Sequence, residues 1–157
     1  MKSDPAVLDI LNQALANELT AVDQYAIHAA MCQNWGFELL HDRFRALSIE
    51  EMRDTEALIK YILFREGKPN IQRLSPLRVG SSVEEMLHLG RETELGAIAT
   101  LQAGIAVCND AEDYATRAML EEMIREEQEH VEWFETQLEI IRQIGLEYYL
   151  SRQLRQG

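Results

Sequence analysis

Acidic residues interrupt the apolar spacing of four long segments, and this pattern restricts the possible folds more than any other feature of the sequence. In the first segment Leu11, Leu15 and Val22 recur at helical intervals, and Glu18 lies between two of them. Because residues at this spacing share one face of a helix, Glu18 is predicted to point into the core. Burying a carboxylate is costly unless an opposite charge compensates it, so the fold has to supply that charge.

The three other segments carry the same interruption, and its spacing repeats. The interrupting residues are Glu18, Glu51, Asp54, Glu94, Glu127 and His130. Thirty-three positions separate Glu18 from Glu51 and also Glu94 from Glu127, and the two halves of the chain are offset by 76 positions throughout. This regularity predicts a pseudo-two-fold arrangement of four helices. Two helices each carry one acidic residue, and the other two each carry an acid-x-x-ligand pair.

Local signals predict where these helices begin and end. Asp4 followed by proline is a good start for a helix over about 5–33, and a second helix is expected over about 37–65. The sequence Ser82-x-x-Glu85 is a capping box that opens a third helix. Asp110 is predicted to cap a fourth helix that ends before Gly145, and a short fifth helix is expected in "LEYYLSRQL".

The connections between the helices predict the topology. Segment 68–82 contains two of the three prolines and no helical period, and it is the only long connection. A long crossover lets the second and third helices run parallel, which predicts an all-α, four-helix bundle with one long crossover and a short C-terminal fifth helix. We expect a single domain over 1–157. A simple up-down bundle is the competing topology, and the length of the connection argues against it.

Composition restricts the function. The 157 residues are 46% hydrophobic and carry a formal net charge of −12, which suits cations as partners and disfavours nucleic acid or an anionic membrane. Asp4 and Asp9 lie where a secretory signal needs apolar residues, and the longest uncharged run, around 96–108, is too short for a bilayer of about 30 Å. Together with two cysteines that form no C-x-x-C pair, these features predict a cytoplasmic protein with reduced thiols.

Five carboxylates and one imidazole inside one bundle require cations. Oxygen-rich ligation with some imidazole suits iron or manganese, and Glu-x-x-His pairs with single glutamates on the other helices are typical of di-iron carboxylate bundles. The pair Glu127-x-x-His130 alone would be weak support, because glutamates on helices usually form an exposed face. Matched spacing on four helices favours a metal site.

The chain resembles the bacterioferritins over essentially its full length. The resemblance is carried by "NELTAVDQYAIHAAM", "NWGFELL", "SIEEM", "ILFREGKPNIQRL", "VEEML", "DYATRAML" and "EEQEHVEWFETQLEIIRQIGLEYYL". It implies the ferritin-like fold and a hollow shell of 24 subunits that takes up Fe(II), oxidises it with dioxygen or peroxide at an intrasubunit di-iron site, and stores ferric mineral. It also implies haem b between paired subunits, and a reductant protein as a partner for iron release.

The resemblance also assigns roles to residues. Glu18, Glu51, Glu94, Glu127 and His130 fall on the family's di-iron ligands, which are also its catalytic residues, with Glu51 and Glu127 as the bridging carboxylates. Met52 falls on the family's haem ligand. One helical step of about 100° turns Met52 away from Glu51 towards the outer surface of the bundle. The alternative role for Met52 is packing in a dry dimer interface.

Asp54 departs from the family pattern, which has a second histidine at this position. An aspartate is a legitimate ligand for a hard cation, but it is shorter than histidine and replaces a neutral ligand by an anion. We therefore expect it to reach a metal through water or after a helix shift, and to favour ferric iron. Two outcomes stay open: the di-iron centre persists in altered form, or the chain is a haem-binding structural subunit with weak or no ferroxidase activity that shares a mixed shell with a competent subunit.

Two other classes of protein use similar bundles. A di-iron oxygenase normally has a longer chain, which encloses an organic substrate. A rubrerythrin-like peroxidase adds a cysteine-ligated iron module, and the two separate cysteines of this chain do not form one. The remaining histidines, His28, His41 and His88, have no partners at ligand spacing and are expected at the surface or in an interface.

Overall fold

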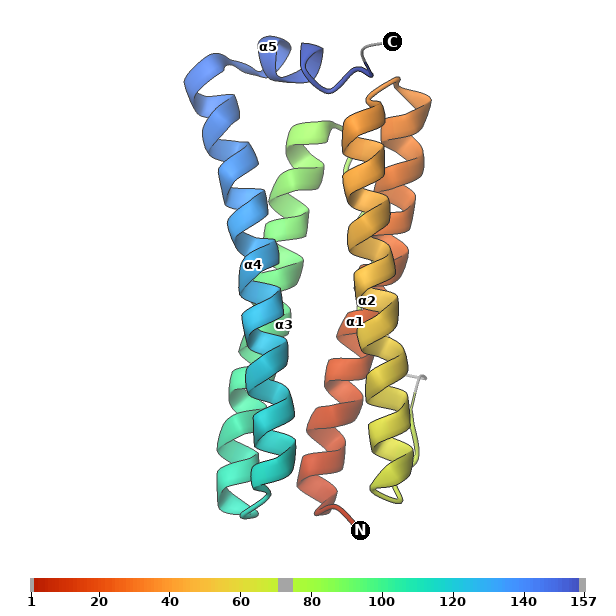
Figure 1. Ribbon diagram of the computed structural model, residues 1–157, viewed down its shortest axis with the longest axis vertical. Coiled ribbons are helices and arrows are strands. Elements are labelled where there is room, and N and C mark those ends of the chain that lie inside the picture. Colours follow the sequence, from red (N-terminus) through yellow and green to blue (C-terminus); the bar gives the residue numbers. More distant parts are fainter. Residues whose placement is uncertain (1, 71–74, 156–157) are drawn as a thin grey trace.

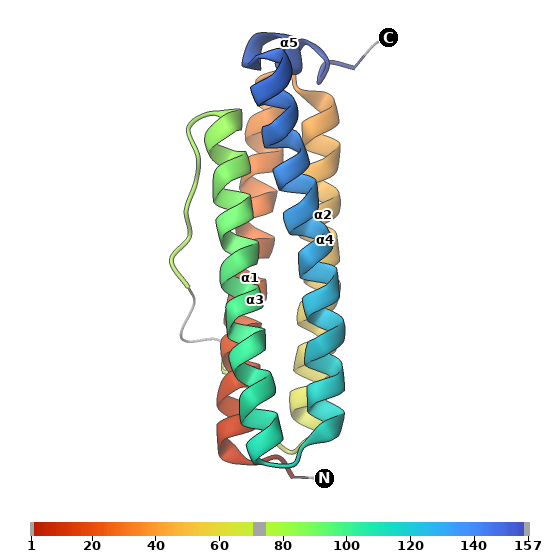
Figure 2. The same ribbon diagram turned by 90° about the vertical axis from the view of Figure 1, so that its left-hand side faces the viewer.

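Four long helices and one short helix form the described part of the chain, residues 2–70 and 75–155, in this computed structural model (Figure 1). They are α1 (Pro5–Asn34), α2 (Glu38–Phe64), α3 (Val83–Asp110), α4 (Tyr114–Ile144) and α5 (Leu146–Ser151). The four long helices lie side by side, and α5 lies across one end of the bundle (Figures 1 and 2). The predicted all-α bundle with a short fifth helix is confirmed.

The lengths of the connections set the direction of each helix. Residues 35–37 join α1 to α2 and residues 111–113 join α3 to α4, so each of these pairs is antiparallel. The connection from α2 to α3 is long, and its described part after Ser75 runs along the bundle (Figure 2). There the Ser75 hydroxyl donates to the side chain of Asn17 on α1, and Arg78 pairs with Glu92 on α3. As a result α2 and α3 run parallel, as predicted for a bundle with one crossover.

Side-chain caps begin three of the helices. Asp4 and Ser82 accept backbone N–H groups at the starts of α1 and α3, as predicted. The prediction that Asp110 caps the fourth helix is wrong, because Asp110 is the last residue of α3. The chain turns only afterwards, at Glu112 with a φ of 54°, and the Asp113 side chain then caps α4 by accepting the backbone N–H of Thr116. None of the described helices combines the length and the apolar character that crossing a lipid bilayer requires.

The apolar core consists of two clusters. The cluster nearer α5 contains Tyr25, Phe44, Met86, Leu87, Phe134 and Tyr149, among others. The cluster towards the opposite end contains Leu11, Leu15, Leu58, Ile62, Leu101 and Leu120, among others. On each long helix the interrupting acidic residue lies between the part that enters one cluster and the part that enters the other. The bundle therefore brings these residues to one level, near the middle of its length.

His28 is buried inside the bundle, so the prediction that it lies at the surface or in an interface is wrong. Its side chain is 0% exposed, its Nε2 accepts the backbone N–H of Gly80 at 3.0 Å, and its ring packs edge-on against Phe44. Burial lowers the pKa of His28 to about 4, so the ring is neutral at physiological pH. Gly80 lies in the crossover and Phe44 lies on α2, so spacing along the sequence gave no sign of either contact.

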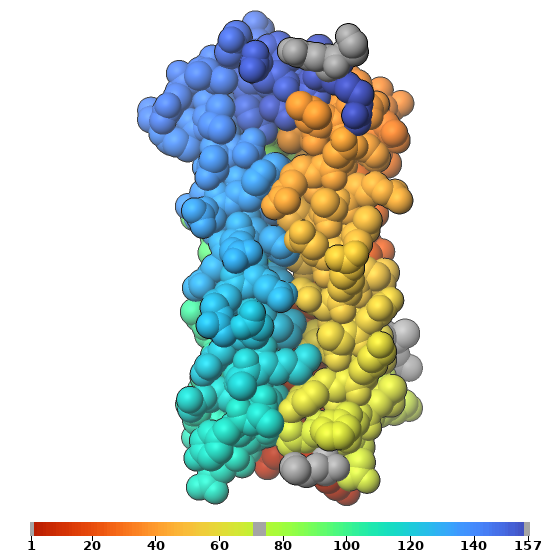
Figure 3. Space-filling view, in the orientation of Figure 1, coloured from red at the N-terminus to blue at the C-terminus, as the bar shows by residue number. Residues whose placement is uncertain are grey.

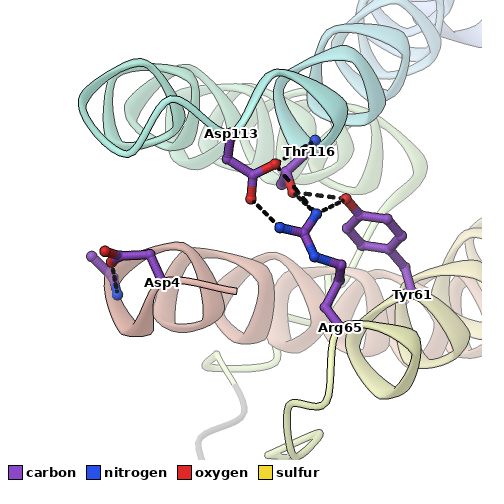
Figure 4. Close-up of polar contacts among 6 residues, drawn as sticks. Asp4, Tyr61, Arg65, Asp113 and Thr116 are labelled. Carbon is purple, nitrogen blue, oxygen red and sulfur yellow. Dashed lines mark hydrogen bonds and ion pairs between the residues drawn. The ribbon is translucent and has the colours of Figure 1, made fainter. Parts of the chain in front are cut away.

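Arg65, at the end of α2, forms an ion pair and hydrogen bonds with residues at the start of α4 (Figure 4). It is 5% exposed, and its guanidinium donates to both carboxylate oxygens of Asp113, at 3.3 and 2.7 Å, and to the hydroxyls of Tyr61 and Thr116, at 2.6 and 3.0 Å. Asp113 is also the cap of α4. One buried ion pair thus fixes the position of a helix start and closes the end of the bundle opposite α5.

Asp113→Ala is expected to lower the free energy of unfolding by about 3–5 kcal/mol, because it leaves the buried Arg65 charge without its partner and removes a helix cap. Asp113→Asn keeps an acceptor for the cap and should cost less. Urea denaturation measures both. Glu92→Ala, which breaks the exposed Arg78–Glu92 pair, is the control and should change stability little. An equal effect of Asp113→Ala and Glu92→Ala would contradict the role given to the buried pair.

Candidate metal centre

The five side chains predicted as di-iron ligands are buried together at the middle of the bundle. Their exposed fractions are 2% for Glu18, 0% for Glu51, 1% for Glu94, 1% for Glu127 and 6% for His130. They come from all four long helices, with α4 supplying the last two from adjacent helical turns. Buried residues of this kind are almost always paired or bound to metal, so the apolar stripes place them where a cation is needed.

Two groups of four side chains have the spacing of metal ligands among the described residues. Single ligand atoms of Glu51, Glu94, Glu127 and His130 all lie within 4.8 Å of one another. The same holds for Glu18, Glu51, Asp54 and Glu127. Glu51 and Glu127 belong to both groups, so the geometry is that of two neighbouring sites with two carboxylates in common.

Several atoms of the cluster are buried without a hydrogen-bond partner among the described residues. They are Oε2 of Glu18, both carboxylate oxygens of Glu51, Oε2 of Glu94, Oε1 of Glu127 and Nδ1 of His130. His130 Nδ1 lies 3.0 Å from Glu51 Oε1, 3.5 Å from Glu94 Oε1 and 3.9 Å from Glu127 Oε2, so the ring faces the carboxylates. Since buried polar atoms in native proteins nearly always have a partner, this donor set fits bound cations.

The electrostatics of the cluster lead to the same conclusion. Burial and the neighbouring Glu94 carboxylate raise the pKa of Glu51 to about 8. Burial alone would lower the pKa of His130, but the facing carboxylates of Glu51 and Glu94 outweigh it and raise that pKa to about 11. Without a metal, the cluster thus limits its negative charge by retaining protons. Divalent cations would displace those protons and neutralise the same charge.

Tyr25 contacts the cluster from α1 and was given no role from the sequence. Its hydroxyl donates to Glu94 Oε1 at 2.5 Å, and the side chain is 0% exposed. Burial and the Glu94 carboxylate raise the pKa of Tyr25 well above its usual value, so it remains a donor. Tyr25 lies seven residues after Glu18 on the same helix face, so the sequence could have predicted that it lies near the cluster. The sequence could not predict its hydrogen bond to Glu94, because Glu94 is on another helix.

Asp54 lies at the edge of the cluster, half-buried on α2. It belongs to the group that also contains Glu18, and Glu126 on α4 is one of the acidic groups close enough to affect its pKa. Burial and the Glu126 charge raise the pKa of Asp54 to about 7. The structure therefore brings the residue that departs from the family pattern to the place that a fourth ligand of the second site would occupy.

The fold and the cluster define the class of this protein as a ferritin-like bundle, and residues 8–144 match the family model described as ferritin-like domain. The chain is similar to the bacterioferritins of Mycobacterium leprae (40% identical, covering 97% of this chain and 96% of the relative) and Streptomyces coelicolor (41% identical, covering 99% and 93%). It is 39% identical to the bacterioferritin of Brucella melitensis, over 95% of this chain and 92% of that protein. The chain belongs to the bacterioferritin family.

Glu51→Gln is expected to stabilise the metal-free protein. Because the pKa of Glu51 is raised from 4.5 to about 8 on folding, the free energy of unfolding falls as the pH rises between these values, and glutamine removes that loss. At pH 8 we expect a gain of about 1–3 kcal/mol, shrinking at pH 6, together with a loss of the stabilisation that added Co²⁺ gives the wild type.

Thermal unfolding at pH 6 and pH 8, with chelator or with Co²⁺, measures both effects. Glu56→Gln, an exposed change five residues further along α2, is the control. An unchanged unfolding midpoint for metal-free Glu51→Gln at pH 8 would mean that the charge of Glu51 does not destabilise the metal-free protein.

Proposed function

We propose that the chain is an iron-storage subunit of a hollow shell of 24 subunits, which takes up Fe(II), oxidises it inside each subunit and stores the ferric product. The observation that carries the proposal is the pair of four-residue groups with Glu51 and Glu127 in common. Two cations that share two carboxylates are held close together, which suits a reaction in which two ferrous ions are oxidised as a pair. Membership in the bacterioferritin family supports the same function.

Each ligand has a distinct role in this proposal. Glu51 and Glu127 bridge the two ferrous ions, Glu94 and His130 complete one site, and Glu18 and Asp54 complete the other. The carboxylates stabilise the higher charge of Fe(III), so they favour loss of one electron from each ion to dioxygen or peroxide. Tyr25 donates a hydrogen bond to Glu94 and so fixes the orientation of this carboxylate.

The proposed function includes haem b, which Met52 would bind. This side chain is 41% exposed, and Ile49 one turn earlier is 43% exposed, so the outer face of α2 carries a thioether beside an apolar surface. Such a face fits a haem enclosed between two subunits, which the Met52 sulfur of each subunit would hold. Bound there, the haem supplies one-electron chemistry. We place the assembled shell in the cytoplasm, with an electron-donating protein as the partner for iron release.

One observation favours a second candidate function. Asp54 is only half-buried at the edge of the cluster, and Glu126 adds a further negative charge close to it. If Asp54 does not bind the second cation, the chain is a haem-binding structural subunit with weak or no ferroxidase activity that shares a mixed shell with a competent subunit. The rate of iron oxidation distinguishes the two functions.

Asp54→His is expected to speed the aerobic oxidation of the first two ferrous ions per subunit. Histidine reaches further from the helix and lowers the negative charge of the centre by one, so it should ligate the second iron directly. Stopped-flow absorbance at two Fe(II) per subunit measures the rate, and the Glu51→Ala, Glu127→Ala double variant gives the background.

Equal rates for wild type and Asp54→His, both well above the background, would mean that Asp54 is already an adequate ligand. If the wild type does not exceed the double variant, the ferroxidase function fails for this chain and the structural-subunit function replaces it.

Met52→Leu is expected to remove the haem while the shell of 24 subunits still assembles. Leucine preserves the apolar contact of methionine but has no sulfur to ligate iron. Native mass spectrometry measures the assembly, and the absorbance spectrum measures the haem. Met119→Leu, on α4, is the matched control and should retain the haem. Full haem content in Met52→Leu would exclude Met52 as the ligand, and a stable dimer in every variant would exclude the shell.

A further inference from the structure

His28 holds the crossover against the bundle through a contact that only a neutral imidazole can make. Its Nε2 accepts the backbone N–H of Gly80 at 3.0 Å. A ring nitrogen that accepts a hydrogen bond carries no proton, so the single proton of the neutral ring lies on Nδ1. A second proton would create an N–H group at Nε2, and two N–H groups would then face each other.

Both partners of this contact are enclosed. His28 is 0% exposed, and its Nδ1 is buried without a hydrogen-bond partner among the residues that the structure describes. Gly80 is buried as well, and a Cβ atom at this position would lie only 2.9 Å from the backbone nitrogen of Met86 on α3. A buried N–H group that loses its acceptor is costly. After protonation of His28, the Gly80 N–H could therefore reach water only if this part of the crossover moved away from the bundle.

The groups around the ring leave His28 as the residue that responds to acid. Phe44, which contacts the ring from α2, carries no charge. Glu85 on α3 favours the protonated ring, but burial has the larger effect and lowers the pKa of His28 from 6.5 to about 4. Tyr25 and Cys32 lie one turn to either side of His28 on α1. Burial raises the pKa of both, so they stay neutral in acid.

The crossover has a second attachment that does not depend on pH. It runs along the side of the bundle opposite the α2–α4 face that Figure 3 shows (Figures 2 and 3). Nearer the start of its described part, the hydroxyl of Ser75 donates to the side chain of Asn17 on α1, and neither side chain titrates. A proton on His28 would therefore release the end near Gly80 and leave the Ser75 end attached.

We propose that the contact between His28 and Gly80 is an acid-sensitive latch, which holds the crossover on the bundle at neutral pH and releases its Gly80 end when the ring gains a proton. In the open form His28 meets water and regains an ordinary pKa of 6.5, whereas in the closed form its pKa is about 4. The closed form is thus favoured fully above pH 6.5 and progressively less as the pH falls towards 4. Over this range the equilibrium constant for opening should rise about tenfold per pH unit, or about 300-fold in all.

Hydrogen–deuterium exchange of the full-length protein, read by mass spectrometry and corrected for the intrinsic effect of pH, measures this opening. Between pH 6 and pH 4 the amides of residues 79–81 should open about tenfold more with each unit, while the amides of α1 around His28 stay protected. Equal opening at pH 6 and pH 4 would overturn the latch. Loss of protection in α1 together with the crossover would also overturn it, because acid would then unfold the bundle as a whole.

Two variants of His28 separate its two roles. In His28→Gln the amide oxygen can still accept the Gly80 N–H but does not titrate, so opening should stay low and should not respond to acid. In His28→Leu nothing accepts that N–H, so opening should be raised already at pH 7 and should not respond to acid either. A rise in acid as steep as that of the wild type, in either variant, would assign the response to another group and overturn the proposal.

Two exposed positions provide the controls. His88→Gln changes a histidine at the surface of α3, and Glu92→Gln breaks the exposed pair with Arg78 in the crossover. Both variants should retain the steep wild-type response to acid. Loss of that response in either control would mean that a surface charge rather than His28 holds the crossover, and it would overturn the latch.

Discussion

The cost of burying several carboxylates inside one bundle governs the rest of this structure. The four glutamates of the cluster are at most 2% exposed, and neighbouring charge and burial raise the pKa of Glu51 to about 8. The apolar clusters on either side of that level supply the burial that keeps the helices together, and the Arg65–Asp113 pair closes one end. A bundle that only had to be stable would be better served by apolar residues at these positions, so the buried glutamates are consistent with a site that could hold cations.

The helices and the buried acidic cluster could be predicted from the sequence because both follow from periods along a single chain. A spacing of three or four residues identifies the buried face of a helix, and the intervals of 33 and 76 positions place Glu18, Glu51, Glu94 and Glu127 at one level of a bundle. Caps at Asp4 and Ser82 are equally local, because the acceptor and the N–H group that it binds lie within a few residues. The outward direction of Met52 follows from its place beside a buried residue.

The features that could not be predicted depend on contacts between elements distant in sequence. His28 is buried because the crossover lies over it, and the contact between His130 and Glu50 exists only where α4 meets α2. The misplaced cap has a different cause. Asp110 and Asp113 are both good caps, and the choice between them depends on where α3 stops, which the buried partner Arg65 helps to decide. Asp54 illustrates the same limit, since Glu126, whose charge affects its pKa, is on another helix.

The two short connections divide the bundle into two hairpins, α1 with α2 and α3 with α4, and this division has a consequence for the metal centre. The first hairpin supplies three members of one four-residue group, Glu18, Glu51 and Asp54, and the second supplies three members of the other group, Glu94, Glu127 and His130. The fourth member of each group comes from the opposite hairpin. The cations would therefore act as internal cross-links, so a loaded subunit should resist the separation of its two halves more strongly than a loss of helix within either half.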